Sequence, residues 1–153
     1  MLTARDIMTR KVVTIGPEAS VEELAKLLEE RRISGVPVLD PDRGLVGVVT
    51  QTDLVQRSRD LDLPPALNIL DLHLFLETPS RFQKRLEKLL GGQVKDVMTA
   101  NPITLAPDTP VKEIARIMST KGVHTLPVVE KGKLVGIVGK LDLIRGLAGP
   151  AEG

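Results

Sequence analysis

The pattern of hydrophobic and polar positions occurs twice along the chain, in the same order. In each copy a short stretch rich in β-branched residues ends at a proline and is followed by apolar residues at helical spacing. Two short apolar segments separated by a turn come next, and a second helical segment closes the copy. The pattern therefore predicts one βαββα unit in each half. The expected strands are 12–15, 36–39 and 45–49, then 103–105, 126–129 and 134–138, with final helices that begin near Thr52 and Leu141.

The residues themselves repeat in a fixed register. The sequence Asp-Ile-Met-Thr at 6–9 returns as Asp-Val-Met-Thr at 96–99, an offset of 96 − 6 = 90. The offset falls to 89 after the turn at 40–44, because that turn is one residue longer than its counterpart. One loop-sized change of register over about fifty positions indicates an internal duplication.

Capping signals mark the beginning of the first helix in each copy. Ser20 and Glu23 have the spacing of a capping box, and Thr109 followed by Pro110 predicts an N-cap with proline at the first helical position. The expected strands are almost entirely apolar, which is typical of sheets that are buried on both faces.

Residues 58–91 have no counterpart in the repeat. They include an apolar run that contains His73 and a segment at 81–90 whose apolar residues share one helical face. We expect a linker helix here that packs on the two copies, with a structural role for His73. A role in docking an effector is the alternative.

Composition restricts the classes of partner. Aromatic residues make up 1% of the chain, so a bound base would meet aliphatic walls, whereas single-stranded nucleic acids usually stack on aromatic rings. The net charge of +1 provides no broad basic surface for a polyanion, so nucleic acid is not an expected partner. The sequence also has no apolar stretch of transmembrane length, and we expect a cytoplasmic protein with no membrane partner.

Catalytic signals are missing from the sequence. The chain has no cysteine, and its two histidines, His73 and His124, are too far apart for a His-x-x-x-His metal pair. It also lacks a Gly-x-Ser-x-Gly elbow, a His-Glu-x-x-His motif and a phosphate-binding loop of the Gly-x-x-x-x-Gly-Lys type. We therefore expect no enzyme activity, no catalytic residues, no metal site and no covalent cofactor.

We expect ligand binding where the second strand of the hairpin in each copy leads into the final helix. The strand at 45–49 leads into Thr50 and Asp53, and a helix N-terminus favours anions. Thr50 adds a hydroxyl, and the Asp53 carboxylate suits two vicinal ribose hydroxyls. The alternative is that Thr50 or Thr52 caps the helix and Asp53 is favourable in its first turn. Asp142 recurs at the corresponding place in the second copy, which favours a binding role.

These motifs together resemble the CBS-domain family. The resemblance rests on the Asp-Ile-Met-Thr segment, the Val-Pro-Val strand at 36–38, the segment 45–54 (Leu-Val-Gly-Val-Val-Thr-Gln-Thr-Asp-Leu), and their counterparts in the second copy. It implies an α+β fold in which tandem βαββα repeats pack sheet to sheet with pseudo-two-fold symmetry, a Bateman module. The expected parts are repeat 1 at 1–57, the insert at 58–91, repeat 2 at 92–147 and a tail at 148–153.

The resemblance also implies two ligand clefts, each made from both repeats. In CBS domains the strand-to-helix end of one repeat contacts the ribose and phosphates of an adenine nucleotide. The Met-Thr segment and the turn before the Pro-Val strand of the other repeat enclose the base and phosphates. Carried over to this sequence, one cleft comprises Thr50, Asp53, Thr99, Ile103, Val123 and His124. The other comprises Lys140, Asp142, Thr9, Val13, Ile33 and Ser34.

The two clefts are expected to differ in affinity. Gly139 stands where the first copy has Thr50, and Ser34 stands where the second copy has His124. His124 alone could also form a hydrogen bond with the backbone. In the CBS-type gamma subunit of AMP-activated kinase, however, a histidine at this place contacts phosphate. We therefore expect the cleft with Asp53 and His124 to bind a phosphorylated nucleotide better.

The function implied by the resemblance is regulatory. The module would sense energy status or a metabolite by binding AMP, ADP, ATP or S-adenosylmethionine in the cleft between its repeats. The alternative is a protein-interaction scaffold whose clefts are vestigial. Modules of this kind usually associate as homodimers, and a pair with no effector domain implies a separate, unidentified effector protein.

Overall fold

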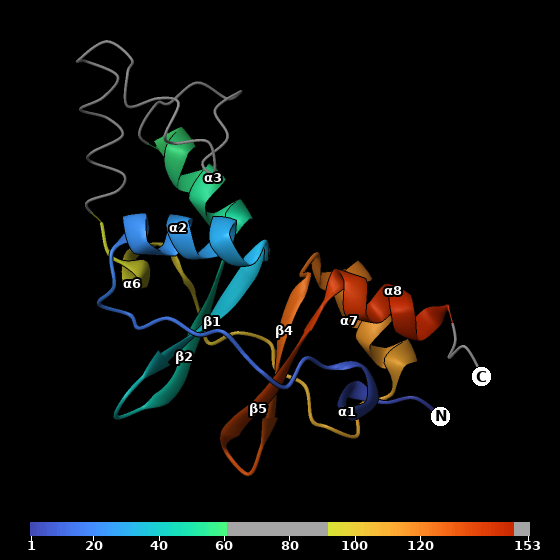
Figure 1. Ribbon diagram of the computed structural model, residues 1–153. Coiled ribbons are helices and arrows are strands. Elements are labelled where there is room, and N and C mark those ends of the chain that lie inside the picture. The colour runs from blue at the N-terminus through green and yellow to red at the C-terminus, as the bar shows by residue number, and fades with distance from the viewer. Residues whose placement is uncertain (61–91, 149–153) are drawn as a thin grey trace. The chain divides into compact units, whose positions relative to one another are not determined.

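The computed structural model describes residues 1–60 and 92–148. The helix expected at 81–90 and His73 lie outside these residues. The helices, shown in Figure 1, are α1 (Ala4–Ile7), α2 (Val21–Arg31), α3 (Gln51–Asp60), α6 (Val94–Val97), α7 (Val111–Lys121) and α8 (Lys140–Leu147). The strands are β1 (Gly35–Asp40), β2 (Gly44–Thr50), β3 (Thr99–Ala100), β4 (Thr125–Glu130) and β5 (Lys133–Gly139). This mixed arrangement of helices and strands confirms the predicted fold class.

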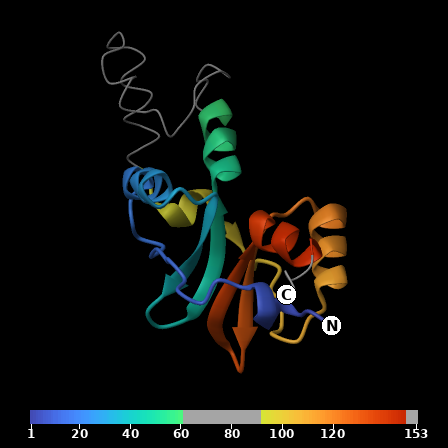
Figure 2. The same ribbon diagram turned by 45° about the vertical axis from the view of Figure 1, so that its right-hand side comes forward.

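The described elements divide into two compact units that cut across the sequence repeat. Unit 1 comprises Met1–Val13 and Asn101–Gly153, and unit 2 comprises Thr14–Ala100. Each unit therefore contains the beginning of one repeat together with the strands and helices of the other. In unit 1, α1 of the first repeat contacts β5 and α8, and α7 and α8 lie side by side (Figures 1 and 2). In unit 2, α6 of the second repeat contacts β2 and α3.

Each repeat contains one antiparallel hairpin, and the two hairpins have the same register. Gly35 pairs with Thr50 in β1–β2, and Thr125 pairs with Gly139 in β4–β5. Both hairpins have a bulge between the fourth and fifth pairs, at 38/39 and 128/129. The strands predicted from the apolar segments are confirmed, and each is slightly longer than expected.

The first expected strand of each repeat is reduced to a single bridge. Ile15 pairs in parallel with Val38, and Leu105 pairs in parallel with Val128. A proline follows two residues after each bridge, and proline has no N–H with which to continue a ladder. The prediction of strands at 12–15 and 103–105 was therefore wrong in length, because each segment forms only one bridge with the neighbouring hairpin.

The helix beginnings agree with the sequence except at α7. The Ser20 side chain accepts a hydrogen bond from the N–H of Glu23 at 3.0 Å, as predicted. The predicted N-cap Thr109 is wrong, because α7 begins at Val111 with Pro110 as its N-cap. The Thr109 hydroxyl instead accepts from the N–H of Ala106 at 3.1 Å and so stabilises the preceding turn.

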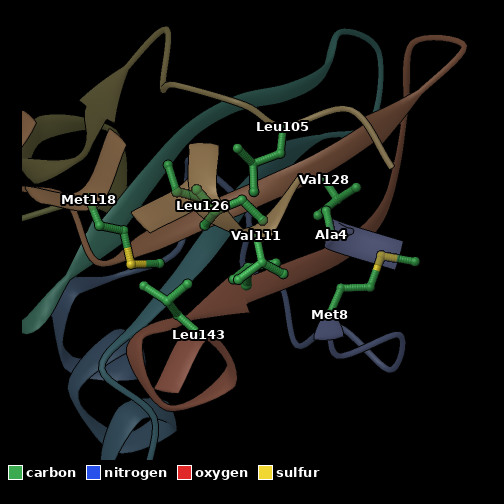
Figure 3. Close-up of a cluster of buried hydrophobic side chains, with 10 residues drawn as sticks. Ala4, Met8, Leu105, Val111, Met118, Leu126, Val128 and Leu143 are labelled. Carbon is green, nitrogen blue, oxygen red and sulfur yellow. The ribbon is translucent and has the colours of Figure 1, made fainter. Parts of the chain in front are cut away.

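The hydrophobic core of unit 1 joins residues from both ends of the chain. Figure 3 shows Ala4 and Met8, from the first repeat, among buried side chains of the second repeat. Burial of aliphatic and thioether side chains of this size contributes about 1.5–3 kcal/mol each. The cluster consists of Ala4, Met8, Leu105, Val111, Ile114, Met118, Leu126, Val128, Val138 and Leu143.

Unit 2 buries an equivalent set of aliphatic side chains. Its fully or almost fully buried apolar residues are Val21, Leu24, Ala25, Leu28, Val36, Val38, Val48, Val49, Leu54 and Val94. Val94 comes from the second repeat, as Ala4 in unit 1 comes from the first. In the part of the chain that the structure describes, no helix is long and apolar enough to span a membrane.

Candidate functional site

The turn between β2 and α3 in unit 2 is closed by reciprocal hydrogen bonds between Thr50 and Asp53. The backbone N–H of Thr50 donates to Asp53 Oδ2 at 2.8 Å, and the Thr50 hydroxyl donates to the same oxygen at 3.2 Å. The Asp53 N–H lies 3.3 Å from Thr50 Oγ1. Thr50, and not Thr52, therefore caps α3, and one carboxylate oxygen of Asp53 serves this cap.

The Asp53 carboxylate lies in a partly buried environment that disfavours its charge. Burial raises the pKa of Asp53, and the two hydrogen bonds from Thr50 offset part of this increase. From the side chains that the structure describes, Asp53 Oδ1 receives no hydrogen bond. The cap therefore fixes the orientation of the carboxylate while its second oxygen stays available as an acceptor.

Thr99 of the second repeat lies beside this turn. It pairs with Val48, two residues before Thr50, as part of the short strand β3. Met98, the preceding residue, lies against Gly47, where the missing side chain leaves room for its sulfur. The Thr50–Asp53 turn and the Met-Thr segment of the other repeat are thus brought together within one unit, and Thr99 is exposed.

The turn between β5 and α8 in unit 1 has a similar geometry, but Gly139 takes the place of Thr50 and Arg145 adds a second contact to the carboxylate. The N–H of Gly139 donates to Asp142 Oδ2 at 2.8 Å, but Gly139 has no hydroxyl to add a second bond. The other oxygen, Asp142 Oδ1, accepts a hydrogen bond from the guanidinium of Arg145. Both oxygens of Asp142 are therefore occupied, and its side chain is 11% exposed.

Thr9 of the first repeat takes the same place in unit 1 as Thr99 in unit 2. Its N–H donates to the carbonyl of Ile137 at 2.8 Å, and the Ile137 N–H donates back at 3.0 Å. Ile137 lies two residues before Gly139, as Val48 lies two residues before Thr50. In both units, a strand-to-helix turn of one repeat therefore lies beside the Met-Thr segment of the other repeat.

The remaining predicted residues are divided between the two units. Ile33 and Ser34 lie in unit 2, where the carbonyls of both accept hydrogen bonds from Gln51, at 3.3 Å and 2.9 Å. The residues in unit 1 are Val13, Ile103, Val123, His124 and Lys140, of which Ile103, His124 and Lys140 are exposed. The grouping of Ile33 and Ser34 with Asp142, and of Ile103, Val123 and His124 with Asp53, stays a prediction.

Two residues of these turns were missed by the sequence analysis. Gln51 ties the first turn to the segment before β1 through the hydrogen bonds just described. Arg145 lies three residues after Asp142, a spacing at which opposite charges meet on a helix, and this spacing could have revealed the pair.

Each turn places an aspartate carboxylate at the N-terminal end of a helix, a combination that suits a ligand with both hydroxyl groups and negative charge. A carboxylate can accept from two vicinal hydroxyls, and the first turn of a helix favours a negative group nearby. Among the described residues, no group of three or more His, Cys, Asp or Glu side chains is arranged to hold a metal ion.

Comparison with models of protein families matches the CBS domain at residues 4–60 and 94–149. Protein MJ1426 of Methanocaldococcus jannaschii is 32% identical over 155 residues, which cover 96% of this chain and 92% of that protein. Chloroplastic CBSX2 of Arabidopsis thaliana is 32% identical over 94% of this chain, which spans 62% of the length of CBSX2. Both matches extend across the two repeats.

Two solved structures with bound adenosine compounds are similar to this chain. The structure of CBSX2 in complex with AMP has a TM-score of 0.70 at 30% identity, and the match covers 97% of each chain. The CBS-domain pair of protein MJ0100 in complex with 5′-methylthioadenosine and S-adenosylmethionine has a TM-score of 0.71 at 25% identity, and covers 97% of this chain and 98% of that one.

Proposed function

Because this chain belongs to the CBS-domain family, we propose that it is a regulatory module that binds an adenosine compound at its Thr50–Asp53 and Gly139–Asp142 turns. The observation that carries the proposal is the repeated juxtaposition of each turn with a Met-Thr segment, through Thr99 beside Val48 and Thr9 beside Ile137. CBSX2 binds AMP, and the pair from MJ0100 binds two adenosine compounds, which supports a ligand of the same class.

Different groups of the first turn would contact the ribose and the phosphates of such a ligand. One oxygen of Asp53 is held by Thr50, so the other can accept from a ribose hydroxyl without the carboxylate rotating. The Thr50 hydroxyl, which donates to Asp53 in this structure, lies at the N-terminal end of α3, and the positive end of the helix dipole favours phosphate oxygens there. The Gly139 turn lacks the hydroxyl, so we propose that it binds phosphorylated ligands more weakly.

Isothermal titration with AMP, ADP, ATP, adenosine and S-adenosylmethionine tests the proposal. Asp53→Asn is the informative variant, because an asparagine oxygen can still cap α3 but the carboxylate charge is removed. We expect Asp53→Asn to weaken binding at the first turn about tenfold or more, since hydrogen bonds to a charged group contribute roughly 1.5–3 kcal/mol. Asp142→Asn probes the second turn in the same way.

Asp108→Asn provides a matched control, because Asp108 is an exposed aspartate before α7 and outside both turns. It should bind every compound as the wild type does. If no adenosine compound binds the wild type at millimolar concentration, and none raises its melting temperature, the proposed function is wrong. The interaction scaffold would then be the better interpretation.

An exposed apolar face on α8 supports self-association as part of the proposed function. The side chains of Leu141, Ile144 and Leu147 are 69%, 51% and 57% exposed. We propose that a second copy covers them, because large apolar side chains gathered on one helix mark interaction surfaces. Light scattering should show a dimer for the wild type and a monomer for Leu141→Glu. The effector protein and the cytoplasmic location stay predictions.

A further inference from the structure

The Asp142 carboxylate differs from that of Asp53 in having a cation on its second oxygen. Gly139 donates to Oδ2, and the guanidinium of Arg145 donates to Oδ1 and forms an ion pair with it. The Arg145 side chain is 68% exposed, whereas that of Asp142 is 11% exposed. A well-hydrated cation therefore covers the oxygen of a buried carboxylate.

The first repeat has no charge at the corresponding position. The offset of 89 between the repeats places Gln56 where the second repeat has Arg145. Gln56 is exposed and neutral, and within the described side chains Asp53 Oδ1 accepts no hydrogen bond. Among the side chains that the structure describes, the two carboxylates therefore differ: Asp53 Oδ1 accepts no hydrogen bond, whereas Asp142 Oδ1 is bound by Arg145.

The ion pair borders open space, so a solute can reach it. Asp142 and Arg145 line a hollow of about 240 Å³ between α1 and α8, together with Leu2, Asp6, Ile7 and Gly146. The arginine can leave the carboxylate without unpacking the core, because its side chain is largely in solvent and Asp142 is held independently by Gly139.

We infer that Arg145 competes with the ribose hydroxyls of the ligand for Asp142 and thereby lowers the affinity of the second turn. The inference rests on the proposed function. To hydrogen-bond Asp142 Oδ1, a ribose hydroxyl must replace the guanidinium, and the charge-assisted bond is lost. Arg145 is thus a specificity-determining residue that separates the affinities of two otherwise similar turns.

Titration with adenosine isolates this effect, because adenosine has the ribose hydroxyls but no phosphate that Arg145 could attract. The measurement compares Asp53→Asn with Asp53→Asn/Arg145→Gln, so that the second turn is observed alone. We expect the double variant to bind adenosine about two- to fivefold more tightly, the range expected for removing an exposed ion pair. At about 0.5 M salt the difference should shrink, because salt weakens the competing pair.

Three further double variants serve as controls. Asp53→Asn/Arg116→Gln breaks an ion pair of the same spacing with Glu113 on α7 and should bind adenosine as Asp53→Asn does. Asp53→Asn/Arg145→Lys keeps the charge and should retain most of the competition. Asp53→Asn/Asp142→Asn should bind adenosine more weakly than Asp53→Asn, and circular dichroism checks that every variant is folded.

The outcomes separate this inference from the proposed function. If the wild type binds adenosine and Arg145→Gln gives equal or weaker binding at the second turn, the role of Arg145 is overturned and the proposed function stands. If neither the wild type nor any Arg145→Gln protein binds an adenosine compound, both are overturned.

Discussion

Met98 lies directly against Gly47, so that a Cβ atom added to this glycine would lie 2.6 Å from the Met98 sulfur and 2.8 Å from the carbonyl oxygen of Thr99. Gly136 lies against the side chain of Met8 in the same way, although no carbonyl oxygen is among the three atoms nearest to an added Cβ there. The Met-Thr segment of each repeat can approach the hairpin of the other repeat only because the strand has no side chain there. The repeated Met and Gly are therefore two halves of one packing contact.

Gly47→Ala should destabilise the protein. The added methyl group meets a backbone carbonyl as well as a flexible sulfur, so the strand and the Met-Thr segment must separate. Overpacking of this kind costs about 1–3 kcal/mol of unfolding free energy, and urea denaturation measures the change. Gly16→Ala is the control, because nothing lies within 4 Å of a Cβ atom at Gly16. Equal stability of the two variants would refute the packing argument.

Arg32→Gly should stabilise the protein. Arg32 ends α2 in the left-handed conformation, with φ 52° and ψ 48°, whereas the second repeat has Gly122 at the same place, with φ 66°. A side chain in this conformation costs about 1 kcal/mol or more, which glycine avoids. After subtraction of the extra entropy of an unfolded glycine, we expect a gain of up to about 1 kcal/mol. The reverse change, Gly122→Ala, should lower the thermal midpoint.

Thr50→Ala should weaken α3, whereas Thr52→Ala should not. Thr50 exchanges hydrogen bonds with Asp53 through its hydroxyl, and removal of an N-cap hydroxyl costs about 1 kcal/mol. Thr52 is exposed in the first turn, where alanine is a better helix former. Chemical denaturation of both variants distinguishes the two threonines. A larger loss from Thr52→Ala would contradict the assignment of the cap.

The pH dependence of stability should contain a contribution from Asp53 that decreases as pH rises. Burial raises the pKa of Asp53 above its ordinary value of 3.8, so the folded state binds more protons than the unfolded state between these two values. The unfolding free energy supplied by this group is therefore fully present below pH 3.8 and is lost as pH rises through the folded pKa.

Comparison with Asp53→Asn isolates this contribution. The carboxyls of Asp6 and Asp40 have lowered pKa values because backbone N–H groups of nearby residues donate to them, and their opposite pH dependence is common to both proteins. The unfolding free energy of the wild type minus that of the variant should thus decrease as pH rises above the ordinary pKa of an aspartate, about 3.9, as urea denaturation at each pH would show. A difference that increases with pH would mean that burial does not control this carboxyl.

Much of the local structure followed from neighbouring residues. The hairpins came from runs of β-branched residues beside a turn, and the cap of α2 came from Ser20 and Glu23. Local rules were insufficient at the beginning of α7. Thr109 has the sequence of an N-cap, but its hydroxyl accepts a hydrogen bond from the N–H of Ala106 in the preceding turn, at 3.1 Å.

The sequence by itself determined that the chain is duplicated, that each copy has a βαββα order, and that Asp53 and Asp142 stand at equivalent helix beginnings. These properties depend on residues close in sequence, whose spacing reports periodicity and capping directly. The resemblance to CBS domains had grouped Thr99 with Asp53 and Thr9 with Asp142, but only the tertiary structure showed the contacts that hold each Met-Thr segment beside its turn, and that Arg145 covers Asp142. Those contacts join residues about fifty to 130 positions apart, or depend on which oxygen of a carboxylate a side chain reaches, and no local spacing encodes them.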